Sequence, residues 1–89
     1  MEAMERPLIW PKGQPLTAGE VASLRHLGFI IRSARLRLGY TQRQLERLSG
    51  VDQTTISRLE NGRLRSLRLV RLAALFEALR GAIDLMVAA

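Results

Sequence analysis

Apolar residues recur every three or four positions in two long stretches of the chain, a spacing that places them on one face of an α-helix. In the first stretch, residues 17–38, these positions are Leu24, Leu27, Ile31, Ala34 and Leu38. Thr17 can cap the start of this helix and Gly39 can end it. Arg25, Arg32 and Arg35 lie off the apolar stripe, so we do not expect them in the core.

The second stretch, residues 67–80, has its apolar positions at Leu69, Leu72, Leu75, Phe76 and Leu79. Gly81 follows this helix and is expected to break it. In the remaining residues, 82–89, the apolar positions alternate in part, which predicts a short β-strand rather than more helix.

A single strand needs a partner edge, and the same strand of a second copy across a two-fold axis is the obvious source. We therefore predict a homodimer formed through this strand. Its predicted contact residues are Ile83, Leu85, Met86 and Val87. Three alternatives stay open: the segment packs as an apolar tail on the first helix, Leu8-Ile9-Trp10 supplies a neighbouring strand, or the helix at residues 67–80 alone forms the dimer interface.

Between the two stretches, residues 41–62 predict two short helices joined by a tight turn. Thr41 and Gln44 have the spacing of a capping box, and Gly50 is where the chain can take the left-handed backbone that ends a helix. Leu45 and Leu48 are assigned to the inner face of this first short helix. The second short helix is capped by Asp52, has Ile56 and Leu59 on its inner face, and ends at Asn61-Gly62.

The other side chains of the second short helix point outward or toward its start. They are Gln53, Thr54, Thr55, Ser57 and Arg58. None of these side chains is acidic, and the first acid of the helix is Glu60. The set supplies the hydrogen-bond donors and acceptors that match base edges in the major groove of DNA. The helix is therefore a candidate for reading DNA sequence.

Residues 41–62 closely resemble the helix-turn-helix of the Cro and lambda-repressor-like proteins, often called the XRE family. The shared features are Thr41-Gln42, Gly50 and the ending Ile56-Ser57-Arg58-Leu59-Glu60-Asn61-Gly62. The resemblance extends at lower density over about residues 24 to 79. Glu46 departs from the pattern, because the family usually has Ala there; either Glu46 points outward or the two helices cross at a slightly wider distance.

The resemblance implies that the partner is double-stranded DNA and assigns roles by position. The base-reading residues are Gln53, Thr54, Thr55 and Arg58. The residues expected to hold the phosphate backbone are Gln42, Arg43, Ser57, Asn61, Arg63 and Arg65. A dimer would place two such helices about 34 Å apart on one face of the duplex, so the operator should be an inverted repeat.

The predicted fold class is all-α: a lambda-repressor-like bundle of four to five helices with a short C-terminal β-strand that pairs in a dimer. Residues 1–16 contain three prolines and no helical period, so they are predicted to form an extended or flexible arm. Residues 17–80 are predicted to form the DNA-binding domain, and residues 81–89 the dimerisation strand.

The charge balance agrees with an anionic partner. The net charge is +6, with thirteen arginines against one lysine, and arginine favours bidentate contact with phosphate or guanine. The chain contains no cysteine, which excludes thiolate zinc sites and thiol catalysis and fits a reducing cytoplasm. No apolar run is long enough to cross a bilayer, so we expect a cytoplasmic protein with no membrane contact.

Other function classes have little support in the sequence. The eight carboxylates are scattered, and the single histidine, His26, has no partner for a catalytic dyad or metal site, so we expect no enzyme activity, metal or cofactor. The leading hypothesis is a dimeric repressor acting on its own or a neighbouring promoter. The alternative is an antitoxin that binds both operator DNA and a toxin protein, since a strand after the helical core resembles Hip-type antitoxins.

Overall fold

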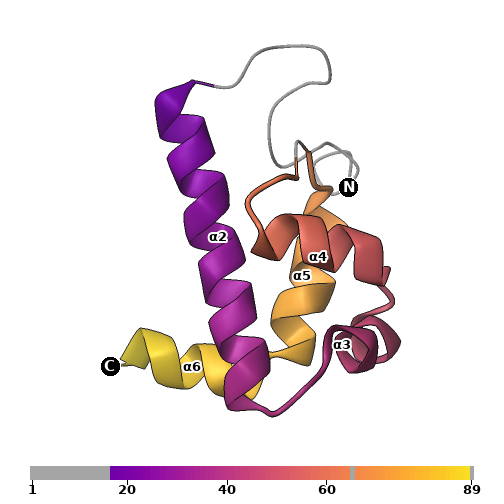
Figure 1. Cartoon of the computed structure of the whole chain (residues 1–89). Coiled ribbons are helices and arrows are strands. Elements are labelled where there is room, and N and C mark those ends of the chain that lie inside the picture. The colour runs from indigo at the N-terminus through magenta and orange to yellow at the C-terminus, as the bar shows by residue number, and fades with distance from the viewer. Residues whose placement is uncertain (1–16, 65, 89) are drawn as a thin grey trace.

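The computed structural model describes residues 17–64 and 66–88, without the side chains of Glu20, Val87 and Ala88. The described residues form five helices (Figure 1): α2 (Ala18–Arg37), α3 (Gln42–Ser49), α4 (Gln53–Glu60), α5 (Leu69–Ala78) and α6 (Arg80–Ala88). The all-α prediction is therefore confirmed for this part of the chain. The predicted arm at residues 1–16 and the phosphate contact predicted for Arg65 lie outside the described residues.

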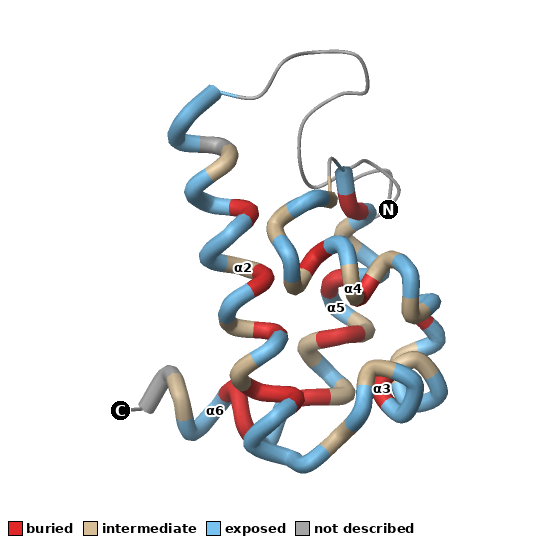
Figure 2. The backbone as a smooth tube through the Cα atoms, in the orientation of Figure 1, coloured by how far each residue is buried: buried red, intermediate tan, exposed pale blue. Residues whose placement is uncertain are grey.

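The long helix α2 runs along one side of the bundle, and α6 extends from beneath its C-terminal end (Figure 1). Helix α2 contacts α4 and α6, α3 contacts α4 and α5, and α5 also contacts α6. Buried positions follow the inner side of α2 and the facing sides of the other helices (Figure 2). The largest buried side chains are Leu24, Ile31, Leu45, Val51, Ile56, Leu59, Leu75 and Leu79.

The two short helices begin and end where their local sequence predicts. Thr41 and Gln44 form the complete capping box at the start of α3, and Gly50 ends that helix with a φ of 77°. Asp52 caps α4 by accepting the backbone N–H of Thr55. These caps fix the turn between α3 and α4, and with it the direction in which α4 leaves the bundle.

Helix α2 approaches α4 closely at Gly28. A Cβ atom at this position would overlap the backbone carbonyl of Leu59, which belongs to the last turn of α4. Only glycine, which has no side chain, lets the two backbones come this near. Gly28 therefore sets the distance between α2 and α4.

The predicted C-terminal strand is wrong, because residues 80–88 form α6. Leu79, Ala82, Ile83 and Met86 have helical spacing, and all four pack into the core or against it. Gly81 does not break a helix: it lies in the first turn of α6, where the chain has already turned at Leu79. Burial of a helical stripe outweighs the partial alternation that suggested a strand.

This correction changes the dimer residues that were predicted from the strand. Ile83 is buried within the single chain, and Met86 is partly buried against the same core, so neither is a free strand residue. Leu85 is 67% exposed, and the side chain of Val87 lies outside the described part. One alternative was that the C-terminal segment packs as an apolar tail on the first long helix. The segment does contact α2, but it does so as a helix.

Three further burial predictions are wrong. Leu38 and Leu48 are exposed, because α2 ends at Arg37 and Leu48 projects from the outer side of α3. Arg35, which lies off the apolar stripe of α2, is buried.

Replacing Gly28 with alanine tests the close approach of α2 and α4. We expect Gly28→Ala to lower the free energy of unfolding by about 3 kcal/mol, the upper end of typical overpacking costs, because the new methyl group meets backbone that cannot swing aside. Gly19→Ala is the matched control on the same helix, where the methyl group meets nothing closer than 4.0 Å. It should leave stability unchanged or raise it by up to about 1 kcal/mol. Urea unfolding followed by circular dichroism measures both, and equal stabilities would contradict the close contact.

Candidate nucleic-acid interface

The first residue of α3 and one face of α4 meet in one shallow surface depression. Its lining residues are Gln42, Gln53, Thr54, Ser57 and Arg58. Gln42 comes from the first position of α3, whereas the other four lie on α4. The structure thus brings together three of the predicted base readers and two of the predicted phosphate contacts, all with polar side chains.

A second depression adjoins the first at Arg58. It is lined by Arg58, Arg63, Leu64 and Ser66. The backbone N–H of Arg63 donates to the carbonyl of Arg58 at 2.8 Å, which holds the loop against the end of α4. Arg58 therefore stands between the polar face of α4 and the basic loop that follows it.

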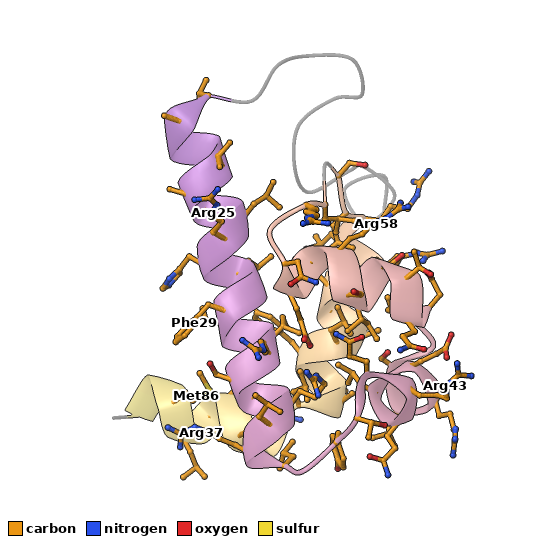
Figure 3. The ribbon with its side chains drawn as sticks, viewed as in Figure 1. Arg25, Phe29, Arg37, Arg43, Arg58 and Met86 are labelled. Carbon is orange, nitrogen blue, oxygen red and sulfur yellow. The ribbon has the colours of Figure 1, made fainter. Side chains whose placement is uncertain are left out.

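Arg43 is exposed in the first turn of α3 and lies away from Arg58, at the other end of this surface (Figure 3). The described arginines at the two ends, Arg43 on one side and Arg58 with Arg63 on the other, bracket the polar face of α4. Because arginine donates to phosphate oxygens, cations in these positions can hold the DNA backbone on both sides of a groove.

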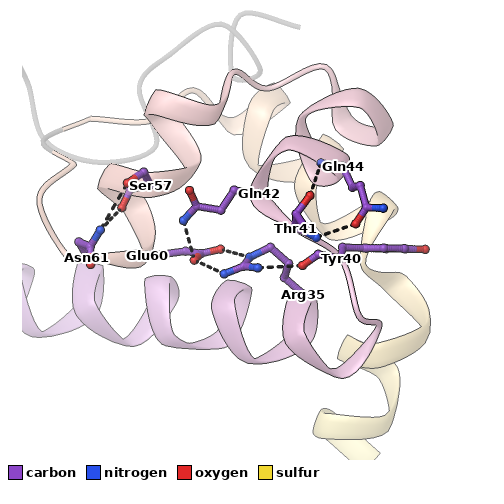
Figure 4. A network of polar contacts seen from close by, with 8 residues as sticks. All are labelled: Arg35, Tyr40, Thr41, Gln42, Gln44, Ser57, Glu60 and Asn61. Atoms are coloured by element: carbon purple, nitrogen blue, oxygen red, sulfur yellow. Dashed lines mark hydrogen bonds and ion pairs between the residues drawn. The ribbon is translucent and has the colours of Figure 1, made fainter.

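A buried ion pair lies beneath this surface and joins α2 to α4 (Figure 4). Arg35 Nε donates to Glu60 Oε2 at 2.7 Å, and Arg35 Nη2 donates to Glu60 Oε1 at 2.9 Å. The two side chains are only 10% and 3% exposed. The hydrogen bond to Glu60 raises the pKa of Arg35 above its ordinary value against the opposing effect of burial. Arg35 Nη1 also donates to the carbonyl of Tyr40 at 2.8 Å, in the connection that leads to α3.

The same carboxylate anchors Gln42. Gln42 Nε2 donates to Glu60 Oε1 at 3.1 Å, so one amide hydrogen of this predicted phosphate contact is already used (Figure 4). The second amide hydrogen and the carbonyl oxygen have no partner among the described residues. Sequence reasoning missed the roles of Arg35 and Glu60, although Glu60 lies within the ending that resembles the XRE family.

Two carboxylates close the start of α4. Glu46 Oε2 accepts the backbone N–H of Gln53 at 3.2 Å, and Asp52 accepts the backbone N–H of Thr55 at 3.1 Å. The sequence left two possibilities for Glu46: that it points outward, or that α3 and α4 cross at a wider distance. Instead, its side chain points toward α4 and caps the start of that helix. These carboxylates occupy the N–H groups of Gln53 and Thr55 and place negative charge at the start of α4, which disfavours a phosphate there.

Thr55 has a structural role that the base-reading prediction did not include. Its hydroxyl donates to Asp52 Oδ1 at 2.7 Å, and the side chain is only partly exposed. Arg71 from α5 also approaches Asp52 Oδ1, at 3.3 Å. Thr55, one of the four predicted base readers, therefore has no hydroxyl hydrogen left to donate to a base.

Asn61 is engaged at the other end of α4. Its side-chain nitrogen lies 2.8 Å from the carbonyl oxygen of Ser57 and 3.4 Å from the Ser57 hydroxyl oxygen (Figure 4). The side-chain amide predicted to hold phosphate is therefore engaged with the last turn of α4, although Asn61 itself is exposed. Asn61 and Gly62 thus shape the exit from α4 toward Arg63.

The described part of the chain offers no group of three or more His, Asp or Glu side chains placed to bind a metal ion. None of its helices has both the length and the apolar character that a membrane crossing requires.

The cap at Asp52 predicts a dependence of stability on pH. The hydrogen bond from the Thr55 hydroxyl, followed by that from the Thr55 N–H, lowers the pKa of Asp52. A carboxyl with a lowered pKa stabilises the fold above its unfolded pKa of about 3.9, and this stabilisation is lost as pH falls through the folded value. Asp52→Asn keeps a capping oxygen but cannot titrate there. Urea unfolding at pH 6 and in acid should therefore show the wild type losing more stability than Asp52→Asn; parallel losses would contradict the cap.

Comparison with protein families assigns the fold described above. The family model HTH_3, described as helix-turn-helix, matches residues 31–85 and so spans the end of α2, both short helices, α5 and the first part of α6. The search of curated proteins gave no match, and the search of solved structures gave none either. Because the family match covers more than half of the chain and contains the whole polar surface of α3 and α4, this protein belongs to the helix-turn-helix family and is a DNA-binding regulator of the XRE type.

Proposed function

We propose that the protein is a sequence-specific regulator of transcription that binds an inverted-repeat operator as a homodimer and represses its own promoter by occupying it. The observation that carries the proposal is the shared depression in which Gln42 meets Gln53, Thr54, Ser57 and Arg58. These side chains offer donors and acceptors but no free acid, as a surface that meets base edges requires.

We assign the reading of bases to Gln53, Thr54 and Arg58. Gln53 can form a bidentate pair with adenine, Thr54 can contact a thymine methyl group, and Arg58 can reach guanine. Thr55 is retained only as a hydrogen-bond acceptor or a methyl contact, because its hydroxyl hydrogen goes to Asp52.

The backbone contacts are assigned to residues around this face. They are Gln42, Arg43, Ser57, Arg63 and, from its sequence position alone, Arg65. The side chain of Asn61 is reassigned to ending α4, since its amide already contacts Ser57. Such contacts fix the register of the protein on the duplex but do not distinguish one base sequence from another.

Repression follows from occupancy, since a dimer on an operator inside a promoter would exclude other proteins from that DNA. The antitoxin alternative rested on a C-terminal strand, and residues 80–88 are helical. With that observation gone, we do not propose a toxin partner.

Selection from a randomised DNA pool tests the proposal for any operator sequence. The protein is incubated with the pool at about physiological salt, because weak non-specific binding dominates at low salt. We expect enrichment of one inverted repeat with half-sites one helical turn apart. No enrichment over successive rounds would contradict sequence-specific binding, and enrichment of a single half-site would contradict the dimer.

Two arginine variants separate base reading from backbone contact. Arg58→Ala should weaken binding to the selected sequence by roughly 1–3 kcal/mol and relax the preference at one operator position. Arg63→Ala should weaken binding to selected and shuffled DNA alike and lower the salt slope by about one. Titrations at several salt concentrations measure both effects. Equal losses on both DNAs for both variants would overturn the assignment.

A further inference from the structure

Helices α2 and α6 both carry apolar side chains that the described residues do not fully bury, near the place where α6 emerges from beneath α2. Phe29 is 63% exposed and leaves α2 on the side from which α6 extends, with Met86 and Arg37 on that same side (Figure 3). Leu36 is also exposed and follows Phe29 by seven residues, so it lies on the same face of α2. On α6, Met86 is partly buried and its neighbour Leu85 is 67% exposed. We call Phe29, Leu36, Leu85 and Met86 the α2–α6 patch.

Single exposed apolar residues are ordinary, but several on one surface indicate a contact with another molecule. Leu48 is exposed too, yet it stands on α3 beside Tyr40, Gln44 and Arg47, on the other side of the bundle. The α2–α6 patch is thus distinct from the DNA-facing side of α3 and α4, and the described residues of the single chain leave it uncovered.

The charges beside the patch match those of a second copy of the chain. Arg37 at the end of α2 and Asp84 on α6 are both exposed, and within the described residues neither takes part in an ion pair. The described part of each copy therefore carries an unpaired cation and an unpaired anion next to its apolar residues. A two-fold axis can bring the anion of one copy to the cation of the other, twice over.

The position of the patch also suits the proposed DNA complex. Helix α2 lies between Phe29 and α4, so a second copy docked on the patch leaves both α4 helices on the outside (Figures 1 and 3). With helices packed at about 8–10 Å from axis to axis, the two α4 helices would be separated by on the order of 30 Å. This is close to the roughly 34 Å between successive major grooves on one face of DNA.

We propose that the α2–α6 patch is the homodimer interface, in place of the β-strand that the sequence had suggested. The proposal deepens the proposed function, because it names the surface that sets the spacing of the two half-sites. It rests on that function only for its role on DNA, since self-association can be measured with the protein alone.

The test is sedimentation equilibrium of the full chain without DNA, over a wide range of protein concentration. We expect a monomer–dimer equilibrium for the wild type. Phe29→Glu should raise the dimer dissociation constant by more than about tenfold, because a carboxylate would enter an apolar contact without a partner. Leu48→Glu is the matched control: Leu48 is 56% exposed against 63% for Phe29, so neither change should unfold the monomer, and thermal melts check this. Leu48→Glu should dimerise like the wild type.

A wild type that stays monomeric at every concentration would overturn the interface, as would a dimer that Phe29→Glu leaves intact. A dimer weakened equally by both variants would also overturn it. These outcomes are separable from failure of the proposed function. If the protein is monomeric but still enriches one DNA sequence, only the proposed interface is contradicted. If the protein forms a dimer that depends on Phe29 but enriches no DNA sequence, only the proposed DNA-binding function is contradicted.

Discussion

The buried ion pair between Arg35 and Glu60 is the interaction on which the rest of the DNA-binding surface depends. Removing two charges from water costs several kcal/mol for each ion, and only close pairing with further hydrogen bonds offsets that cost. Here the guanidinium binds both carboxylate oxygens and also the carbonyl of Tyr40, and the carboxylate accepts a further bond from Gln42. A position of α4 that separated the two charges would strand both of them, so the pair fixes where α4 lies on α2.

The neighbouring features complete this constraint. Gly28 allows the last turn of α4 to touch α2, and Glu46 of α3 accepts a hydrogen bond from the first turn of α4, which Asp52 caps. Helix α4 is therefore fixed at both ends, while the side chains of Gln53, Thr54 and Arg58 remain available to DNA. Apolar packing of Ile56 and Leu59 gives α4 its stability, whereas the polar contacts decide its orientation, and orientation is what places Gln53 and Arg58 on a base edge.

Features that depend on neighbouring residues could be predicted from the sequence. The capping box at Thr41, the turn at Gly50 and the cap at Asp52 were predicted, because each needs only the chemistry of three or four successive residues. Arg35 was misplaced because its partner is 25 positions away, and no local pattern shows that a charged residue beside the apolar stripe will be paired. Residues 80–88 were misread for a related reason: a short apolar run fits a strand or a helix, and its contact with α2 decides which. The predicted base readers and phosphate contacts were brought together only in part, since Thr55 and Asn61 serve the ends of α4.

The most direct measurement compares Arg35→Met with the double variant Arg35→Met/Glu60→Leu, using urea unfolding and titration with the selected operator. The single variant should lose about 3–5 kcal/mol of stability because Glu60 is left buried and unpaired, and the double variant should regain most of it. The double variant also lacks the hydrogen bond from Gln42 to Glu60. A hydrogen bond to a charged group contributes about 1.5–3 kcal/mol, so we expect the double variant to bind the operator about tenfold or more weakly than the wild type, even though it is stable. A double variant that recovers both stability and full operator affinity would contradict the claim that this ion pair orients the DNA-binding surface.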